Sequence, residues 1–213
     1  MALFACSGTT VLRGLVSFPF AGLWTASLVL EAPAAPSGAV TITAPGLALT
    51  GVVARGGSQY ERTSVRVVGS TAGRRVVKKF WRGVPLRLPL ADVVAAFSGA
   101  LAADIDPALL AQRLEVWGRA ADTGARELDA LAAVAGATWR ARDDGAIWLG
   151  TDAWPAVDLT HRTIAVAEAK RTRTIALEDF SLRPGVTLDG MRLARVTYRI
   201  DQERVRCDVV GQP

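Results

Sequence analysis

The stretch ARVTYRIDQERVRCDVV, residues 194–210, decides the fold that the sequence predicts. Alternate positions carry residues that share one strand face: Ala194, Val196, Tyr198 and Ile200. Arginine and threonine lie between them, and the alternation returns at Val205, Cys207 and Val209 after a turn expected at Asp201-Gln202. A period of two is typical of strands with one buried face. We therefore expect a hairpin that closes or edges a β-barrel.

The first 88 residues continue this strand pattern. Apolar-rich stretches of strand length follow one another: Leu12–Phe18, Trp24–Leu30, Val40–Thr43, Leu47–Val53 and Arg62–Val68. Turn residues separate them at Pro33–Gly38, Pro45-Gly46, Gly56-Gly57 and Gly69–Gly73, and a further strand is expected over Arg75–Trp81. Strands of this length and spacing predict a sandwich or a small barrel.

The pattern changes period after residue 88. Apolar residues about one helical turn apart form a single stripe: Leu90, Val93, Val94, Phe97 and Leu101. With Pro89 suited to the first turn, this stripe predicts a helix over 89–102. Asp106-Pro107 predicts the start of a short second helix, and Asp122–Ala135 predicts a third that ends at Gly136. The middle third is therefore expected to be rich in α-helix.

Strands return after Gly136. Two segments flank the turn residues Asp143-Asp144-Gly145 and predict a hairpin over Thr138–Arg142 and Ala146–Leu149. We expect Trp139 and Trp148 to pair across it. A further strand is expected at Thr172–Leu177, and turns at Pro184-Gly185 and Asp189-Gly190 lead into the stretch at 194–210.

The net charge of +5 is unevenly distributed along the chain. Residues 1–88 carry 10 basic and 2 acidic side chains, whereas residues 89–213 carry 15 basic and 18 acidic ones. An electrostatic partner should therefore prefer the first part of the chain. Because most of these cations are spread singly over outward strand faces, we expect the basic first part and the acidic remainder to meet as complementary surfaces within an assembly.

The sequence contains no clear targeting signal and no cysteine motif for metal binding or redox chemistry. Cys6 and Cys207 lie near opposite ends without CxxC spacing, which argues against a zinc knuckle or a dithiol centre and favours a reducing compartment. Leu3-Phe4-Ala5-Cys6 is similar to the end of a lipoprotein signal, but no basic region and no apolar stretch of about 7–15 residues precedes it. Apolar runs fall short of the ~20 residues of a membrane-spanning helix. We expect a soluble, unprocessed protein with no membrane anchor.

No catalytic or cofactor motif stands out. The glycine clusters fit no phosphate-binding loop, and His161, the only histidine, has no GxSxG nucleophile elbow to serve, so we interpret it as an ordinary strand or surface residue. Acidic residues come in pairs: Asp104 with Asp106, Asp143 with Asp144, and Glu178 with Asp179. Two carboxylates can catalyse the hydrolysis of a glycosidic bond, but helix caps and turns also favour acidic residues at these positions. We predict no catalytic residue, no cofactor and no metal ion.

One basic run is the best candidate for a binding element. Five cations and a tryptophan gather within it, of which the candidate contact residues are Arg74, Arg75, Lys78, Lys79, Trp81 and Arg82. With Phe80 beside Trp81, the run could follow a phosphate backbone and stack a base. It also suits an exposed strand at an interface with an acidic neighbour. Both interpretations stay open at this point.

The order of these pieces resembles a known family, the baseplate hub (tail hub) proteins of long-tailed bacteriophages and related contractile injection particles. A strand-rich first part precedes Val84-Pro85-Leu86 and Leu90-Ala91-Asp92-Val93-Val94, which introduce a helix. Ala137-Thr138-Trp139-Arg140, Asp144-Gly145 and Ile147-Trp148-Leu149-Gly150 follow. The most telling part is the ending, Leu182-Arg183-Pro184-Gly185-Val186-Thr187-Leu188-Asp189-Gly190 leading into Val196-Thr197-Tyr198-Arg199-Ile200-Asp201. The resemblance spans about residues 10–210.

The resemblance implies an α+β fold that is mainly β, with two small tail-tube-like β-barrels joined by an α-rich segment. The expected domains are an N-terminal barrel at 1–88, a connecting segment with the tryptophan hairpin at 89–150, and C-terminal barrel strands at 151–213. The family further implies a non-enzymatic subunit that is assembled in the host cytoplasm and belongs to the virion tail.

The same resemblance implies the partners. Three copies form a ring that joins the tail tube to the central spike and surrounds a channel for DNA. The expected neighbours are a tail tube or distal tail protein, the spike and the tape measure protein, with only passing, unspecific contact with DNA. A single-stranded nucleic-acid-binding barrel is the first alternative, and a tail-associated cell-wall hydrolase is the second.

Overall fold

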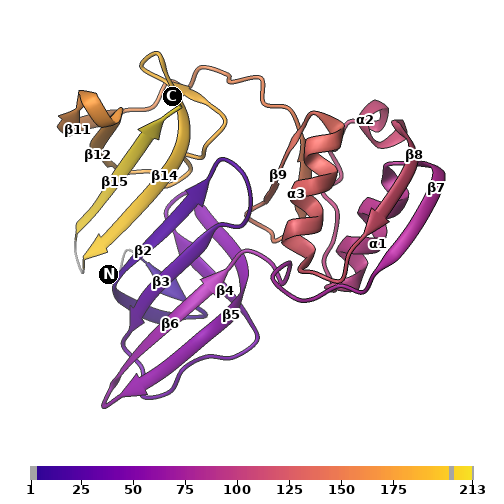
Figure 1. Ribbon diagram of the computed structural model, residues 1–213. Coiled ribbons are helices and arrows are strands. Elements are labelled where there is room, and N and C mark those ends of the chain that lie inside the picture. Colours follow the sequence, from indigo (N-terminus) through magenta and orange to yellow (C-terminus); the bar gives the residue numbers. More distant parts are fainter. Residues whose placement is uncertain (1–3, 202–203, 213) are drawn as a thin grey trace. The chain divides into compact units, whose positions relative to one another are not determined.

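The computed structural model describes residues 4–201 and 204–212. Strands make up 51% of the chain and helices 14%, which confirms that the fold is mainly β. The chain groups into two compact units, Met1–Gly69 with Asp152–Pro213, and Ser70–Thr151 (Figure 1). The expected division at residues 88 and 150 stays a prediction about domains.

Six strands of the first unit close into a β-barrel. They are β1 (Ala5–Cys6), β2 (Thr9–Pro19), β3 (Thr25–Leu30), β4 (Ala39–Ala44), β5 (Leu47–Gln59) and β6 (Arg62–Val68). The hydrogen-bonded order is β1-β4-β5-β6-β3-β2, and β1 also pairs with β2, so the ring of pairings is complete. The first part of the sequence therefore forms the small barrel that its strand spacing predicted.

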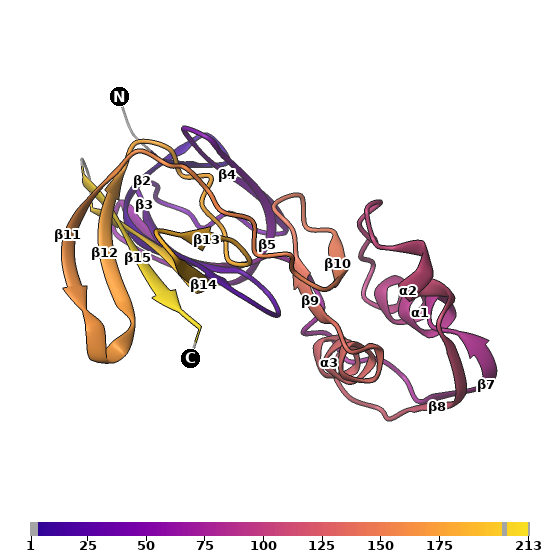
Figure 2. The ribbon, with the colours of Figure 1, turned by 90° about the horizontal axis from the view of Figure 1, so that it is seen from above.

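The C-terminal strands extend this sheet. They are β11 (His161–Ala167), β12 (Thr172–Leu177), β13 (Thr187–Leu188), β14 (Met191–Asp201) and β15 (Arg204–Gly211). The order β2-β14-β15-β12-β11 continues outward from the barrel (Figure 2), while β13 pairs with β14 alone. Among the described strands only the first six close into a ring, so the expected second barrel is not observed. The turn expected at Asp201-Gln202 includes a residue outside the described ranges.

Strand β2 explains why the extension joins the barrel. Its first residues, Thr9 and Thr10, pair with β1, whereas Arg13 to Pro19 pair with Asp201 to Arg195 of β14. Seven consecutive pairs fix the register between segments that are far apart in the sequence. The hairpin of residues 194–210 is therefore confirmed, but it borders the first barrel and does not close a second one.

An aromatic chain fills the core of this unit. Ring centroids lie 4.9 Å apart for Phe4 and Phe180, 5.5 Å for Phe180 and Tyr198, 6.1 Å for Tyr198 and Phe18, and 6.3 Å for Phe18 and Trp24. Because buried phenols need a hydrogen-bond partner, Tyr198 donates its hydroxyl to the Leu182 carbonyl at 3.0 Å. The chain of rings runs from barrel strands to C-terminal strands and gives both one continuous core.

One expected turn proves to be strand. Gly56 and Gly57 lie inside β5 and pair with Val65 and Ser64 of β6. The hairpin instead turns near Tyr60, which has a φ of 56° and is 91% exposed. The two glycines were misassigned because glycine marks a turn only when the backbone needs a positive φ, and here the strand runs on through them.

The second unit combines three helices with two ribbons. Its elements are β7 (Lys79–Pro85), α1 (Arg87–Ala96), α2 (Pro107–Ala111), β8 (Arg113–Arg119), α3 (Gly124–Ala135), β9 (Thr138–Ala141) and β10 (Ile147–Gly150). Asp106 caps α2 by accepting a hydrogen bond from the Ala108 amide at 2.8 Å, as its sequence predicted. Gly136, with a φ of 63°, ends α3 in the left-handed conformation that suits glycine.

The helix expected over 89–102 is too long at its C-terminal end. Helix α1 ends at Ala96, because Ser98 adopts a φ of 60° and the chain leaves the helix there. Leu101 then forms a parallel bridge with Ile147. Four of the five stripe residues keep their expected place: Leu90, Val93, Val94 and Phe97 are buried.

Two expectations about the ribbons need correction. The strand expected at Arg75–Trp81 is β7, which begins only at Lys79 and includes Val84 and Pro85. The two tryptophans of the β9–β10 hairpin do not pair, because Trp139 faces Leu149 and Trp148 faces Arg140 across the ladder. Adjacent strand residues point to opposite faces, so the two indoles lie on different sides of the hairpin.

We predict that Gly51→Ala destabilises the barrel whereas Gly57→Ala, on the same strand, does not. A Cβ at Gly51 would lie 2.6 Å from the Trp24 ring and 2.7 Å from the Val68 carbonyl oxygen, but nothing lies within 4 Å of one at Gly57. Overpacking of this kind costs about 1–3 kcal/mol. Chemical denaturation measures the free energy of unfolding, and equal values for the two variants would contradict the packing of Trp24.

Candidate functional site

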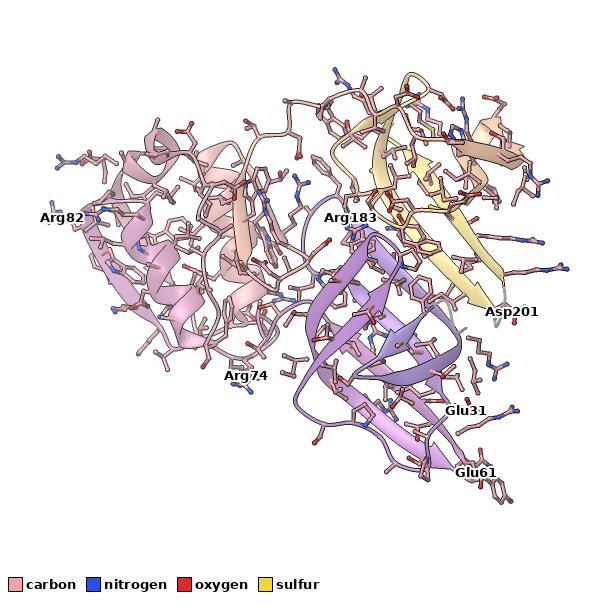
Figure 3. All side chains as sticks on the ribbon, turned by 180° about the vertical axis from the view of Figure 1, so that it is seen from behind. Glu31, Glu61, Arg74, Arg82, Arg183 and Asp201 are labelled. Atoms are coloured by element: carbon pink, nitrogen blue, oxygen red, sulfur yellow. The ribbon has the colours of Figure 1, made fainter. Side chains whose placement is uncertain are left out.

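The basic run of residues 74–82 lies in the second unit and is not one compact patch. Arg74 belongs to a bend, Arg75 forms a bridge with Thr123, and only the last cations lie on β7. Figure 3 shows Arg74 and Arg82 at separate places on this unit. The candidate contact residues are therefore spread over a bend, a bridge and a strand, and their role as a binding element stays a prediction.

Lys79 and Trp81 lie on the same face of the β7–β8 ribbon and contact side chains of their own unit, although Lys79 stays exposed and Trp81 is half-buried. They pair across the ribbon with Arg119 and Trp117 of β8. The Lys79 amine and the Arg119 guanidinium each lie 5.3 Å from the centre of the Trp81 ring. This arrangement of two cations around an indole is a cation–π contact. Two of the six candidate contact residues are thus occupied by their own unit.

Asp92 of α1 forms ion pairs with both of these cations. Its carboxylate accepts a hydrogen bond from the Lys79 amine and lies 2.9 Å from the Arg119 guanidinium, whose side chain is only 1% exposed. Arg119 also donates to the Val77 carbonyl at 2.8 Å. Partial burial acts to raise the pKa of Asp92, but the hydrogen bonds and charges of Lys79 and Arg119 outweigh it and hold that pKa below its usual value.

Glu127 of α3 contacts the same face of the ribbon, beside Trp117. It accepts a hydrogen bond from the Trp117 indole at 2.7 Å. Burial raises the pKa of Glu127, and the Trp117 hydrogen bond and the Arg119 charge offset that only in part. The sequence alone does not predict that Asp92, Arg119 and Glu127 meet at this ribbon, because the short alternation Leu114-Glu115-Val116 is a weak sign of β8.

The opposite side of the ribbon remains available to a partner. Phe80 is 65% exposed and Val116 is 59% exposed, and Val116 pairs directly with Arg82. We call Phe80, Arg82 and Val116 the outer ribbon face; exposed Val77 and Lys78 precede it in the chain. A face with two large apolar side chains beside a cation suits an apolar protein surface with acidic neighbours. Nucleic-acid stacking needs several spaced aromatic rings, and here Phe80 is the one ring on the face.

The paired acidic residues occupy caps, turns and surface ion pairs. Asp104 pairs with Arg142, and Asp144 accepts a hydrogen bond from the Ala146 amide at 2.9 Å. Asp179 accepts hydrogen bonds from the amide and hydroxyl of Ser181. These contacts are the local backbone bonds that turns use. They give no specific support to glycoside hydrolysis.

His161 begins β11 and contacts no nucleophile in the described structure. Its Nδ1 donates to the Leu159 carbonyl at 2.8 Å, and its Nε2 lies 3.1 Å from an Asp189 carboxylate oxygen. Across residues 4–201 and 204–212, no three His, Cys, Asp or Glu side chains gather as metal ligands would. None of the helices described is long and apolar enough to cross a membrane.

Both cysteines are buried in strands of the first unit. Cys6 of β1 and Cys207 of β15 are each 1% exposed. Burial raises the pKa of both thiols, and for Cys207 burial together with the nearby Asp208 charge raises the pKa to about 12 despite the opposing Arg183 charge. Because the thiolate is the reactive form, both side chains behave as core residues.

The comparisons with known proteins agree on the fold. No protein-family model and no curated protein sequence matches the chain. Among solved structures, the 43 kDa tail protein of prophage MuSo2 from Shewanella oneidensis aligns over 98% of this chain and 97% of its own, with a TM-score of 0.70 and 11% identity. A tail protein from Neisseria meningitidis MC58 aligns over 98% of this chain and 96% of its own, with a TM-score of 0.65 and 12% identity.

A third solved structure comes from a secretion system. The E. coli c3393 protein, a component of the type VI secretion system described as structurally similar to T4 tail proteins gp27 and gp5, aligns over 99% of this chain and 77% of its own. Its TM-score is 0.58 and its identity 10%. At these identities the similarity shows the fold. The predicted resemblance to tail proteins is therefore supported by the architecture of nearly the whole chain.

We predict that Asp92→Asn destabilises the second unit by about 1–3 kcal/mol at neutral pH, because it leaves the buried Arg119 without its counter-charge. Asp104→Asn is the matched control: its pair with Arg142 is exposed, so the loss should stay below about 0.5 kcal/mol. The folded pKa of Asp92 is lowered, so its stabilisation is complete above the unfolded pKa and disappears as the pH falls through the folded value.

Denaturation of the wild type and both variants between pH 7 and pH 3 measures these effects. The difference between the wild type and Asp92→Asn should shrink as the pH falls. A difference that is the same at every pH would show that the Asp92 charge contributes nothing.

We also predict that neither thiol reacts with iodoacetamide at pH 8 in the folded protein. Unfolding in denaturant should make both Cys6 and Cys207 reactive, since each then returns to an ordinary thiol pKa of about 8.5. Mass spectrometry of the labelled chain counts the adducts. Rapid labelling of either cysteine before unfolding would contradict its place in the core.

Proposed function

We propose that the chain is a structural subunit of a bacteriophage tail or phage-like injection particle. In this proposal it forms the baseplate hub ring that joins the tail tube to the central spike and surrounds the DNA channel. The observation that carries the proposal is the closed barrel with its four-strand extension. Solved tail proteins share this fold over nearly their full length. The subunit is not an enzyme in this proposal.

Strand β11 supports the assembly role. One edge of β11 pairs with β12, and in the described part of the chain no strand pairs with its other edge. After His161 every residue of the strand is exposed, including Ile164 at 42% and Val166 at 49%. Monomeric proteins usually protect such an edge with charges, proline or a covering element. An open edge with two apolar side chains suits pairing with another subunit.

The outer ribbon face supplies a second docking surface of the same kind. Phe80 and Val116 are large apolar side chains that the second unit leaves in solvent. Aromatic anchors surrounded by polar groups are typical of protein interface centres. Ring subunits need two such surfaces, because each copy contacts a neighbour on both sides. In the proposed virion tail, the tube or distal tail protein, the spike and the tape measure protein are the further neighbours.

We predict that the purified chain self-associates and that Ile164→Lys with Val166→Lys prevents this. The two lysines place charge on the exposed edge, so the dissociation constant should rise on the order of 100-fold. Val134→Lys is the control, because Val134 is similarly exposed at 49% but lies on α3. Light scattering after size-exclusion chromatography measures the mass, and circular dichroism checks that the variants fold.

Images of purified tail particles test the location. A threefold ring between tube and spike, containing this chain, is the expected result. A wild-type chain that stays monomeric at its highest soluble concentration and is missing from purified tails contradicts the proposal.

A further inference from the structure

The strand register of the first unit places arginines side by side. Arg206 of β15 lies opposite Arg199 of β14, and Arg66 of β6 lies opposite Arg55 of β5. Leu15 of β2 and Ser27 of β3 complete the row between these pairs, because Arg199 pairs with Leu15 and Ser27 with Arg66. We call these six residues the arginine row. It crosses six adjacent strands in the order β5-β6-β3-β2-β14-β15, which are labelled in Figure 1.

The neighbouring rows on the same face add to this charge. One row contains Arg204, Asp201 and Arg13, followed by Val29, Ser64 and Gly57. The row on the other side contains Asp208, Thr197, Ser17, Thr25, Val68 and Val52. Three rows therefore hold six arginines against two aspartates. Strand spacing of about 4.8 Å makes each row on the order of 24 Å long, measured along the sheet.

Three of these six cations have no counter-charge among the described residues. Arg199 pairs with Asp208, which also accepts a hydrogen bond from Thr174. Within the described residues, by contrast, Arg55, Arg66 and Arg206 form no ion pair, and all three are exposed. Arginines that stabilise a fold are normally paired or stacked, as Arg119 is. Three unpaired arginines on one face are therefore available to an external anion.

The composition of the face selects between two kinds of anionic partner. A protein partner would need an apolar centre, and Leu15, at 46% exposure, is the one large apolar side chain of these rows that is exposed. The remaining positions are arginine, two aspartates, serine, threonine, one glycine and half-buried valine. No aromatic ring lies in the three rows, so the face offers no platform for stacked bases. Guanidinium groups on a polar, solvated face suit the phosphates of a nucleic-acid backbone.

We propose that the arginine row, and not the run of residues 74–82, is the nucleic-acid-facing surface of this protein. It contacts the sugar-phosphate backbone of duplex DNA without reading its sequence. The inference rests on the proposed function, because it names the face of the hub subunit that turns toward the DNA channel. Contact through exposed arginines alone is weak and depends strongly on salt.

The test compares two matched triple variants. Arg55→Ser with Arg66→Ser and Arg206→Ser removes unpaired arginines from the row and keeps Arg199 for Asp208. Arg74→Ser with Lys78→Ser and Arg82→Ser removes the same charge from the run predicted by sequence, where all three side chains are exposed. Fluorescence anisotropy of a labelled duplex and a labelled single strand of equal length is measured over a series of salt concentrations. Unlabelled polyglutamate is the competing acidic polypeptide.

The wild type should bind the duplex at low salt, and the row variant should bind at least about tenfold more weakly, with a salt slope reduced by about 0.9 for each lost phosphate contact. The variant of residues 74–82 should keep wild-type binding. Circular dichroism verifies that both variants fold.

Three results would overturn the proposal: no salt-dependent binding by the wild type, a loss confined to the variant of residues 74–82, or stronger binding of polyglutamate than of duplex at equal charge. Light scattering on the same samples reports self-association separately. Loss of the ring and loss of DNA contact are therefore distinguishable.

Discussion

The backbone pairing of β2 is the constraint on which the larger unit depends. One edge of β2 bonds to β3, and the other bonds first to β1 and then to β14. The short pairing with β1 closes the barrel, and the long pairing with β14 adds the C-terminal strands. A slip of one residue between β2 and β14 would turn Tyr198 outward and Arg199 into the core. Register here decides which side chains are buried as well as which strands meet.

The same pairing changes what the charge distribution means. Along the sequence the cations concentrate in residues 1–88, and the remainder is slightly acidic. In the sheet, Arg199 and Arg206 from the acidic part share a row with Arg55 and Arg66 from the basic part. A division of charge along the chain is therefore not a division in space. Both parts of the chain contribute arginines to the arginine row, and the expected meeting of a basic first part with an acidic remainder between subunits stays a prediction.

Local patterns predicted local structure well. The alternation at Arg62–Val68 and Thr172–Leu177 predicted β6 and β12 with the bounds that the structure shows, because period two reflects one buried face. The candidate binding residues were less predictable. Lys79 and Trp81 contact their own unit only because β8, more than thirty residues later, pairs with β7 and brings Arg119 and Trp117 to them. The arginine row is unpredictable from local sequence for the same reason, because no short window contains Arg55, Arg66 and Arg199 together.

Exposed apolar side chains and exposed arginines bind their partners through different physical effects. Ile164, Val166, Phe80 and Val116 lose unfavourable contact with water when another protein covers them, so their exposure favours lasting association. Exposed arginines gain little from burial and keep their hydration, so contact with a phosphate backbone releases counterions and remains reversible. The proposed hub subunit, which would hold its neighbours while DNA moves past it, would need both properties. Strand alternation supplies the second, because it keeps arginine outside and apolar residues within the same strands.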